Sequence, residues 1–176
     1  MLTKIIVVIG AVLVAGAAIA GGTDIEATLK ADLDQVVDSG SVEPVDGITA
    51  AGQPDKAAFE VFARSGYTTV IDLRGENENR GLDEVAVVEE LGMDYVLFPI
   101  TGPDAISYDN ARKLDKLIED AEGPVLVHCG SSNRVGALLA LSKKLDGADV
   151  NTAMSYGIEG GMTGLAGMVE SLLKED

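Results

Sequence analysis

Short apolar runs of strand length alternate with segments of helical periodicity along most of this chain. Residues 67–73, 94–100 and 123–129 are apolar runs rich in β-branched residues, and a shorter run begins at Ile48. Apolar residues recur at helical spacing within 55–66, 82–92, 108–121, about 134–146, and in two further segments of the tail. Alternation of this kind predicts right-handed crossover units and a mostly parallel sheet.

We therefore expect an α/β fold, a three-layer sandwich with a mostly parallel central sheet of about four to five strands flanked by helices. The apolar strands fit burial under helices on both faces. With 176 residues and 47% hydrophobic residues, the chain can build one domain with a sizeable core. Because aromatic residues make up only 4%, that core must consist mainly of Val, Leu, Ile and Ala.

The first 22 residues differ in composition from the rest. One lysine precedes a long uncharged run that ends in Ala18-Ile19-Ala20, a pattern typical of a secretory cleavage site. Residues 1–22 are therefore interpreted as a signal peptide, and the alternative is an uncleaved membrane anchor. Both interpretations predict an exported protein, periplasmic or secreted, or held at the membrane. Residues 23–46 form a polar segment, a short helix or a tether, and residues 47–176 form the α/β domain.

Charge and residue counts exclude several functions. The formal net charge of −16 argues against nucleic acid as a partner, because phosphate backbones are bound by Lys and Arg. The single cysteine, Cys129, cannot form an internal disulfide. With one cysteine and one histidine, the chain offers no Cys/His metal cluster, and we expect neither a metal nor a cofactor.

The segment "GPVLVHCGSSNRVGALLAL", residues 123–141, concentrates the chemically reactive residues. A strand leads to Cys129, a small loop of residues 130–133 follows, and Arg134 opens a helix. In open α/β sheets, ligands bind outside the carboxyl ends of the strands, which is where this loop lies. The loop amides and the helix N-terminus predict an anion cradle, and Arg134 adds a two-pronged grip on an oxyanion. The positive potential of the loop amides and the helix N-terminus also favours the thiolate form of Cys129.

A thiolate in such a cradle can attack phosphorus and form a phosphocysteine that water later hydrolyses. The simpler alternative is that Cys129 is an unreactive, buried residue at the end of a strand. His128 is expected to point to the opposite face of the sheet from Cys129, because adjacent strand residues alternate.

A general acid is also needed, and Asp104 in "TGPDAIS" is the best placed by chain order. The alternative for Asp104 is an ordinary Pro-Asp turn, and Asp72 is a weaker candidate for the acid.

The charged loop "RGENENRG" follows the 67–73 run. Arg74 and Arg80 are candidates to brace the site or to receive substrate charge. For Arg80, and for Glu76 and Glu78, the simpler interpretation is a solvated loop.

Three stretches resemble a known family: "ITAAGQPDKAAFEVFARSGYTTVIDLRGENE", "LGMDYVLFPI" and the 123–141 segment. They resemble cysteine-dependent phosphatases of the dual-specificity type, and more closely the bacterial phosphatase-like domain often fused to β-lactamase-like hydrolases. The resemblance implies a metal-independent phosphate-monoester hydrolase acting on a phosphorylated protein or small molecule. It implies Cys129 as nucleophile and Arg134 as the phosphate-gripping residue. The phosphate cradle would be formed by Gly130, Ser131, Ser132 and Asn133.

The sequence departs from that family in two ways. Four residues separate Cys129 from Arg134, where the common signature has five. Ser132 stands where these families usually have glycine. Because the shorter loop is similar to that of rhodanese-like sulfurtransferases, a persulfide on Cys129 is the alternative chemistry. A non-catalytic oxyanion-binding module and a free redox thiol are the remaining alternatives.

Overall fold

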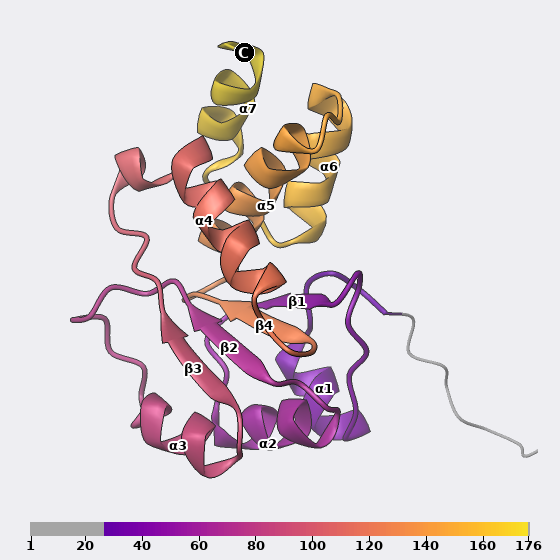
Figure 1. Cartoon of the computed structure of the whole chain (residues 1–176), viewed down its shortest axis with the longest axis vertical. Helices are drawn as coiled ribbons and strands as arrows, with labels where there is room; N and C mark the ends of the chain where they lie inside the picture. The colour runs from indigo at the N-terminus through magenta and orange to yellow at the C-terminus, as the bar shows by residue number, and fades with distance from the viewer. Residues whose placement is uncertain (1–26, 176) are drawn as a thin grey trace, which may run out of the picture.

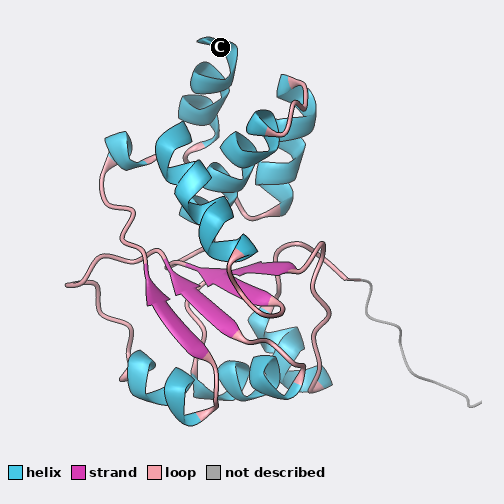
Figure 2. Ribbon diagram, in the orientation of Figure 1, coloured by secondary structure: helices cyan, strands magenta, loops and turns pink. Residues whose placement is uncertain are grey.

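The computed structural model describes residues 27–175, so the segment interpreted as a signal peptide or anchor, 1–22, lies outside the described residues. Within the described part, four strands form one fully parallel sheet in the order β1-β4-β2-β3. All four arrowheads point to the same side (Figure 2). The strands are β1 (Ile48–Ala51), β2 (Thr69–Asp72), β3 (Asp94–Leu97) and β4 (Val125–His128).

Helices cover both faces of the sheet, so the expected three-layer α/β architecture is confirmed (Figure 1). One face carries α1 (Leu33–Ser39), α2 (Lys56–Arg64) and α3 (Glu84–Glu90). The other carries α4 (Tyr108–Glu119) and α5 (Asn133–Leu145). Two further helices, α6 (Val150–Glu159) and α7 (Ala166–Glu175), pack against α5.

Side-chain caps explain where the helices begin. The carboxylate of Asp55 accepts a hydrogen bond from the amide of Ala58, and the Ser107 hydroxyl accepts one from the amide of Asn110. Each bond satisfies an amide that has no partner within its helix. The predicted starts of α2 and α4 are thereby confirmed.

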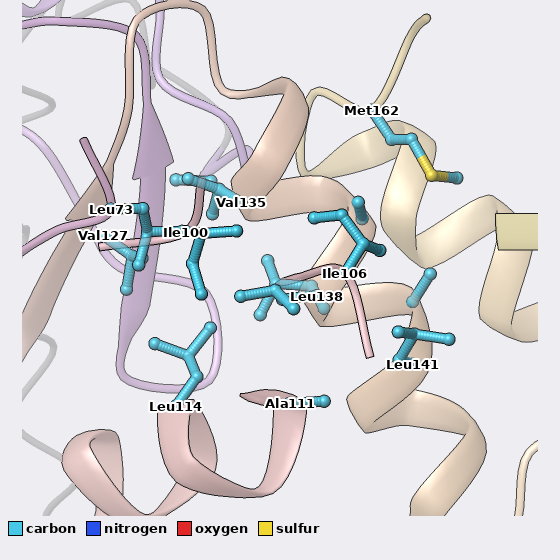
Figure 3. Close-up of a cluster of buried hydrophobic side chains, with 14 of the residues drawn as sticks. Leu73, Ile100, Ile106, Ala111, Leu114, Val127, Val135, Leu138, Leu141 and Met162 are labelled. Atoms are coloured by element: carbon cyan, nitrogen blue, oxygen red, sulfur yellow. The ribbon is translucent and has the colours of Figure 1, made fainter. Parts of the chain in front are cut away.

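Two apolar clusters hold the layers together. The larger fills the space between the sheet and α4–α7 (Figure 3). The smaller, with the fully buried rings of Phe59 and Phe62, lies between the sheet and α1–α3. Larger-cluster members labelled in Figure 3 include Leu73, Ile100, Leu114, Val127 and Leu138.

Strand β3 differs from the expectation that every strand is buried. β1, β2 and β4 are buried along their whole length, whereas Asp94 and Leu97 at the ends of β3 are exposed. The reason is position, because β3 is an edge strand with only β2 as its neighbour.

The polar segment before β1 lies against the sheet from residue 27 onward. The amide of Ala31 donates to the Ala50 carbonyl at 2.9 Å, and the amide of Ala50 donates to the Leu29 carbonyl at 2.7 Å. Helix α1 then packs against α2. None of the helices between residues 27 and 175 has the length and apolarity needed to cross a membrane.

Candidate active site

Cys129 directly follows β4, which lies between β1 and β2, so the predicted place of the loop at the end of a central strand is confirmed. The amide of Cys129 donates to the Ala51 carbonyl at 3.3 Å, and the amide of Gln53 donates to the Gly130 carbonyl at 3.4 Å. The start of the loop is therefore fastened to the end of β1.

His128 and Cys129 point to opposite faces, as the alternation of strand residues predicts. Cys129 belongs to the cluster under α4 and α5, and it is a free thiol in a residue only 1% exposed. His128 lies on the other face, where its ring packs edge-on against Phe59 with centroids 6.2 Å apart. The His128 imidazole therefore packs on the face of the sheet that carries α2 and does not contact the Cys129 sulfur.

Ser132 adopts the left-handed conformation at φ 70°, ψ −3°. This backbone is the one that favours glycine, which explains why a glycine is usual at this position in the families it resembles. The Ser132 side chain is fully buried, and its hydroxyl donates to the Gly160 carbonyl at 2.8 Å. Ser131 forms an isolated antiparallel bridge with Gly52, just after β1, and the bond from the Gln53 amide to the Gly130 carbonyl is part of that bridge. The loop after β4 is therefore held against the residues that follow β1.

The Arg134 guanidinium connects the ends of three strands. Its Nη1 donates to the carbonyls of Leu73, after β2, and Ile100, after β3, at 3.3 and 3.2 Å. Nη1 and Nη2 also donate to the two carboxylate oxygens of Glu78 at 2.6 and 2.8 Å. Glu78 is the main reason that the pKa of Arg134 is raised; burial partly offsets this effect, and the neighbouring Cys129 raises the pKa further. Loop geometry therefore brings Cys129 and Arg134 together.

Glu78 is a structural partner of the site, and its interpretation as a solvated residue is wrong. Besides Arg134, its carboxylate accepts from the amide of Gly75 at 2.8 Å and from Nε of Arg74 at 3.2 Å. The hydrogen bond from Arg134 is the main cause that lowers the Glu78 pKa to about 2. Glu78 is therefore ionised over the whole ordinary pH range.

Arg80 is also not solvated, contrary to the expectation. Its Nε donates to Asp72 at 2.5 Å, and Asp72 is fully buried. Asp72 additionally accepts from the hydroxyl of Tyr95 at 2.8 Å and from the amide of Arg74 at 2.7 Å. Burial, together with the bond to Asp72, raises the pKa of Tyr95. Asp72 thus braces the loop after β2 on the face opposite the thiol, which favours its structural role over that of an acid.

Three buried side chains could by their chemistry hold a metal ion: one ligand atom each of Asp72, Glu84 and His128 lies within 4.8 Å of the others. Nε2 of His128 lies 2.7 Å from Glu84 and 3.8 Å from Asp72. Arg80 and Tyr95 already bind the Asp72 carboxylate, and Nε2 of the Gln53 side chain donates to Glu84 at 2.6 Å. The trio is therefore a hydrogen-bonded support beneath the loop.

Two clefts flank the loop. One of about 410 Å³ has Arg134 and Glu78 in its wall together with apolar residues, and the other, of about 450 Å³, includes Lys30 and Ser131. Asp104 lies in an exposed 3-10 turn, η1 (Pro103–Ala105), whose first residue lines the smaller cleft. Asp104 itself does not line that cleft, so its role as the acid stays a prediction. The apolar wall of the smaller cleft is formed by Ile100, Pro103, Ile106 and Leu165.

Sequence comparison identifies the family. Residues 41–148 match the model of the beta-lactamase hydrolase-like protein, phosphatase-like domain. Beta-lactamase hydrolase-like proteins of Agrobacterium fabrum and Xylella fastidiosa are 34% and 38% identical over 104 residues. Those residues are 57% of this chain but 24% of each relative, so the match spans about a quarter of the relatives' length.

Solved phosphatases share the fold. A candidate phosphatase from Neisseria meningitidis aligns with a TM-score of 0.61 at 22% identity, covering 70% of this chain and 92% of that one. The core catalytic domain of the PP-IP phosphatase SIW14 from S. cerevisiae gives 0.58 at 16%, covering 74% and 82%. TpbA from P. aeruginosa, solved in complex with pTyr, gives 0.53 at 18%, covering 73% and 86%. With its fold shared by phosphatases and most of its domain matched by the family model, this chain belongs to the phosphatase-like domain family of beta-lactamase hydrolase-like proteins.

Proposed function

We propose that this protein is a phosphate-monoester hydrolase that acts through a phosphocysteine on Cys129 and needs no metal. The observation that carries the proposal is the joint placement of Cys129, at the end of β4, and Arg134, in the first turn of α5, on either side of the short loop 130–133. A phosphoryl group bound there would receive backbone hydrogen bonds and the free edge of the guanidinium. Phosphotyrosine in a protein, or a small phosphorylated molecule, is the proposed substrate class.

In this mechanism the Cys129 thiolate attacks phosphorus, and the S–P bond forms as the bond to the leaving oxygen breaks. Asp104 is proposed to give that oxygen its proton. Water then hydrolyses the phosphocysteine and releases phosphate. The loop amides and Arg134 stabilise the charge on the phosphoryl oxygens throughout both steps.

The test is turnover of p-nitrophenyl phosphate by the purified protein and by Cys129→Ser. We expect the substitution to abolish turnover, and rapid quenching of the wild type to trap one phosphoryl group on Cys129, seen by mass spectrometry. Asp104→Asn should slow release of p-nitrophenol less than release of a poorer leaving group such as tyrosine, because p-nitrophenolate leaves without a proton. Activity that survives Cys129→Ser would contradict the mechanism.

A second candidate is a sulfurtransferase, and the four-residue spacing between Cys129 and Arg134 favours it. In that reaction the thiolate takes the outer sulfur of thiosulfate, sulfite leaves, and cyanide then takes the sulfur from the persulfide as thiocyanate. Thiocyanate formation and one added sulfur on Cys129 would select this candidate. Oxyanion binding with neither reaction would select the non-catalytic module.

A further inference from the structure

Gln53 lies in the loop after β1 and contacts the loops that follow β2 and β4. It follows β1 by two residues, and its amide N–H donates to the carbonyl of Gly130, the first residue after Cys129. In a trans peptide the C=O and the following N–H point in opposite directions. By holding the Gly130 carbonyl toward β1, Gln53 therefore turns the amide of Ser131 away from β1.

The side chain of Gln53 joins two charged partners of opposite sign. Its Nε2 donates to Oε2 of Glu84 at 2.6 Å, and its Oε1 accepts from Nη1 of Arg74 at 2.5 Å. A carboxylate only accepts and a guanidinium only donates, so the amide can take only this orientation. Glu84 is itself fixed, because it is 2% exposed and its other oxygen binds His128.

From Gln53 the hydrogen-bond network continues to Arg134. Arg74 donates to Glu78 at 3.2 Å, and Glu78 binds Arg134 with both of its oxygens. A continuous chain of hydrogen bonds thus runs from the residue before Cys129 to the guanidinium five residues after it. Gln53 contributes its uncharged side-chain amide to that chain, between Glu84 and Arg74, and it lines neither cleft beside the loop. The chain consists of His128, Glu84, Gln53, Arg74, Glu78 and Arg134.

We propose that Gln53 is a positioning residue that sets the plane of the Arg134 guanidinium, through Arg74 and Glu78, and the direction of the first loop peptide. The inference rests on the proposed function only in that both use Arg134 to hold an oxyanion. Gln53 does not touch the reacting atoms, so its effect must be measured through Arg134 and Cys129.

Two substitutions separate positioning from folding. Gln53→Ala removes the side-chain bonds to Glu84 and Arg74 and should lower kcat/KM for p-nitrophenyl phosphate by about ten- to a hundredfold. Gln53→Glu keeps the acceptor for Arg74 but places a second carboxylate against Glu84. Two carboxylates at that distance share a proton as the pH falls, which restores the bond. The groups facing this position are Glu84, from α3, and Arg74, with His128 and Asp72 behind Glu84.

We therefore expect the activity of Gln53→Glu, relative to the wild type, to recover between pH 8 and pH 5, whereas the relative activity of Gln53→Ala stays low throughout. The chain's other glutamine, the exposed Gln35, provides the matched control Gln35→Ala, which should equal the wild type. With a merely structural role for Gln53, the activity of each variant would follow its folded fraction, which circular dichroism measures at each pH.

A second readout does not need turnover. Cys129 is the single thiol of the chain, so alkylation reports on it alone. The ratio of its rates with iodoacetate, an anion, and iodoacetamide, a neutral reagent, measures the positive charge held beside the sulfur and cancels the thiolate fraction. The ratio should fall severalfold in Gln53→Ala and should fall, then recover at low pH, in Gln53→Glu.

The two proposals can fail separately. A wild type that does not hydrolyse p-nitrophenyl phosphate, yet whose alkylation ratio depends on Gln53 as expected, would overturn the phosphatase and support the positioning residue. Wild-type turnover with Gln53 variants that match Gln35→Ala in both measurements would overturn the role of Gln53. Circular dichroism and urea unfolding identify any variant that has lost its fold, and in that case Gln53→Glu, the isostere, decides.

Discussion

Helices α5 and α6 pack so closely at Gly136 that a single methyl group should destabilise the protein. A Cβ on Gly136 would lie 2.3 Å from the Gly157 carbonyl oxygen and 2.3 Å from the Met162 amide nitrogen. Both are backbone atoms, so no side-chain rotation can relieve the overlap, and α6 must move away from α5. Gly136→Ala is therefore expected to separate two helices whose contact buries part of the larger core.

Two effects of opposite sign decide the magnitude. Alanine in place of glycine within a helix stabilises it by about 1 kcal/mol. Overpacking against backbone costs about 3 kcal/mol, the upper part of the usual range, because the overlap is severe. The net loss is about 2 kcal/mol, which corresponds to a fall of about 4–8 °C in Tm for a domain of this size.

Urea unfolding followed by circular dichroism measures this loss, and the midpoint should fall with an unchanged slope. Gly167→Ala is the matched control, because Gly167 lies in α7 and a Cβ there meets nothing within 4 Å. The control should be as stable as the wild type or more so, by up to about 1 kcal/mol. If Gly136→Ala were no less stable than Gly167→Ala, the close packing of α5 on α6 would be refuted.

Two further substitutions test the loop after β2. Glu78→Gln should lower kcat/KM about tenfold, since Arg134 loses its charged partner, and steady-state kinetics with p-nitrophenyl phosphate measures it. Folding lowers the pKa of Glu78 from 4.5 to about 2, so the ionised carboxylate stabilises the wild type above pH 4.5, and this stabilisation is lost toward pH 2. The difference in urea midpoint between the wild type and Glu78→Gln should therefore shrink in acid, and a difference that grew would contradict this. Tyr95→Phe removes one of three donors to Asp72 and should cost about 1 kcal/mol in urea unfolding, whereas a loss above about 3 kcal/mol would mean that Arg80 and the Arg74 amide together cannot hold the buried carboxylate.

The architecture was predictable because its signals are local. Helix starts such as Asp55 and Ser107 are visible in the sequence, and alternation of strands with helices leaves few topologies. The burial of β3 was not predicted correctly, since its apolar run resembles those of the central strands. Whether a strand lies at the centre or the edge of a sheet depends on sheet order, which the run itself does not encode.

In the candidate site, too, one part could be predicted from the sequence and another could not. Cys129 and Arg134 are five positions apart, so their meeting follows from one loop. Their partners are distant in sequence: Glu78 lies 56 residues from Arg134, and Glu84 lies 44 residues from His128. A glutamate in a loop rich in Gly and Asn has the composition of a solvated segment, and only the three-dimensional arrangement shows that it meets a guanidinium. Parallel strands bring such loops to one edge of the sheet, but sequence does not say which side chains then pair.

Residues beyond the family match explain how the loop tolerates its departure from the family pattern. Ser132 occupies a left-handed conformation that costs a non-glycine residue about 1 kcal/mol or more. The region matched to the family ends at residue 148, yet the Ser132 hydroxyl binds the Gly160 carbonyl. The neighbouring Gly161, with φ 95°, leaves room that a Cβ would fill at 2.6 Å from Ser132. Since the turn after α6 both bonds Ser132 and makes space for it, the shape of the loop between Cys129 and Arg134 depends in this chain on its own C-terminal helices.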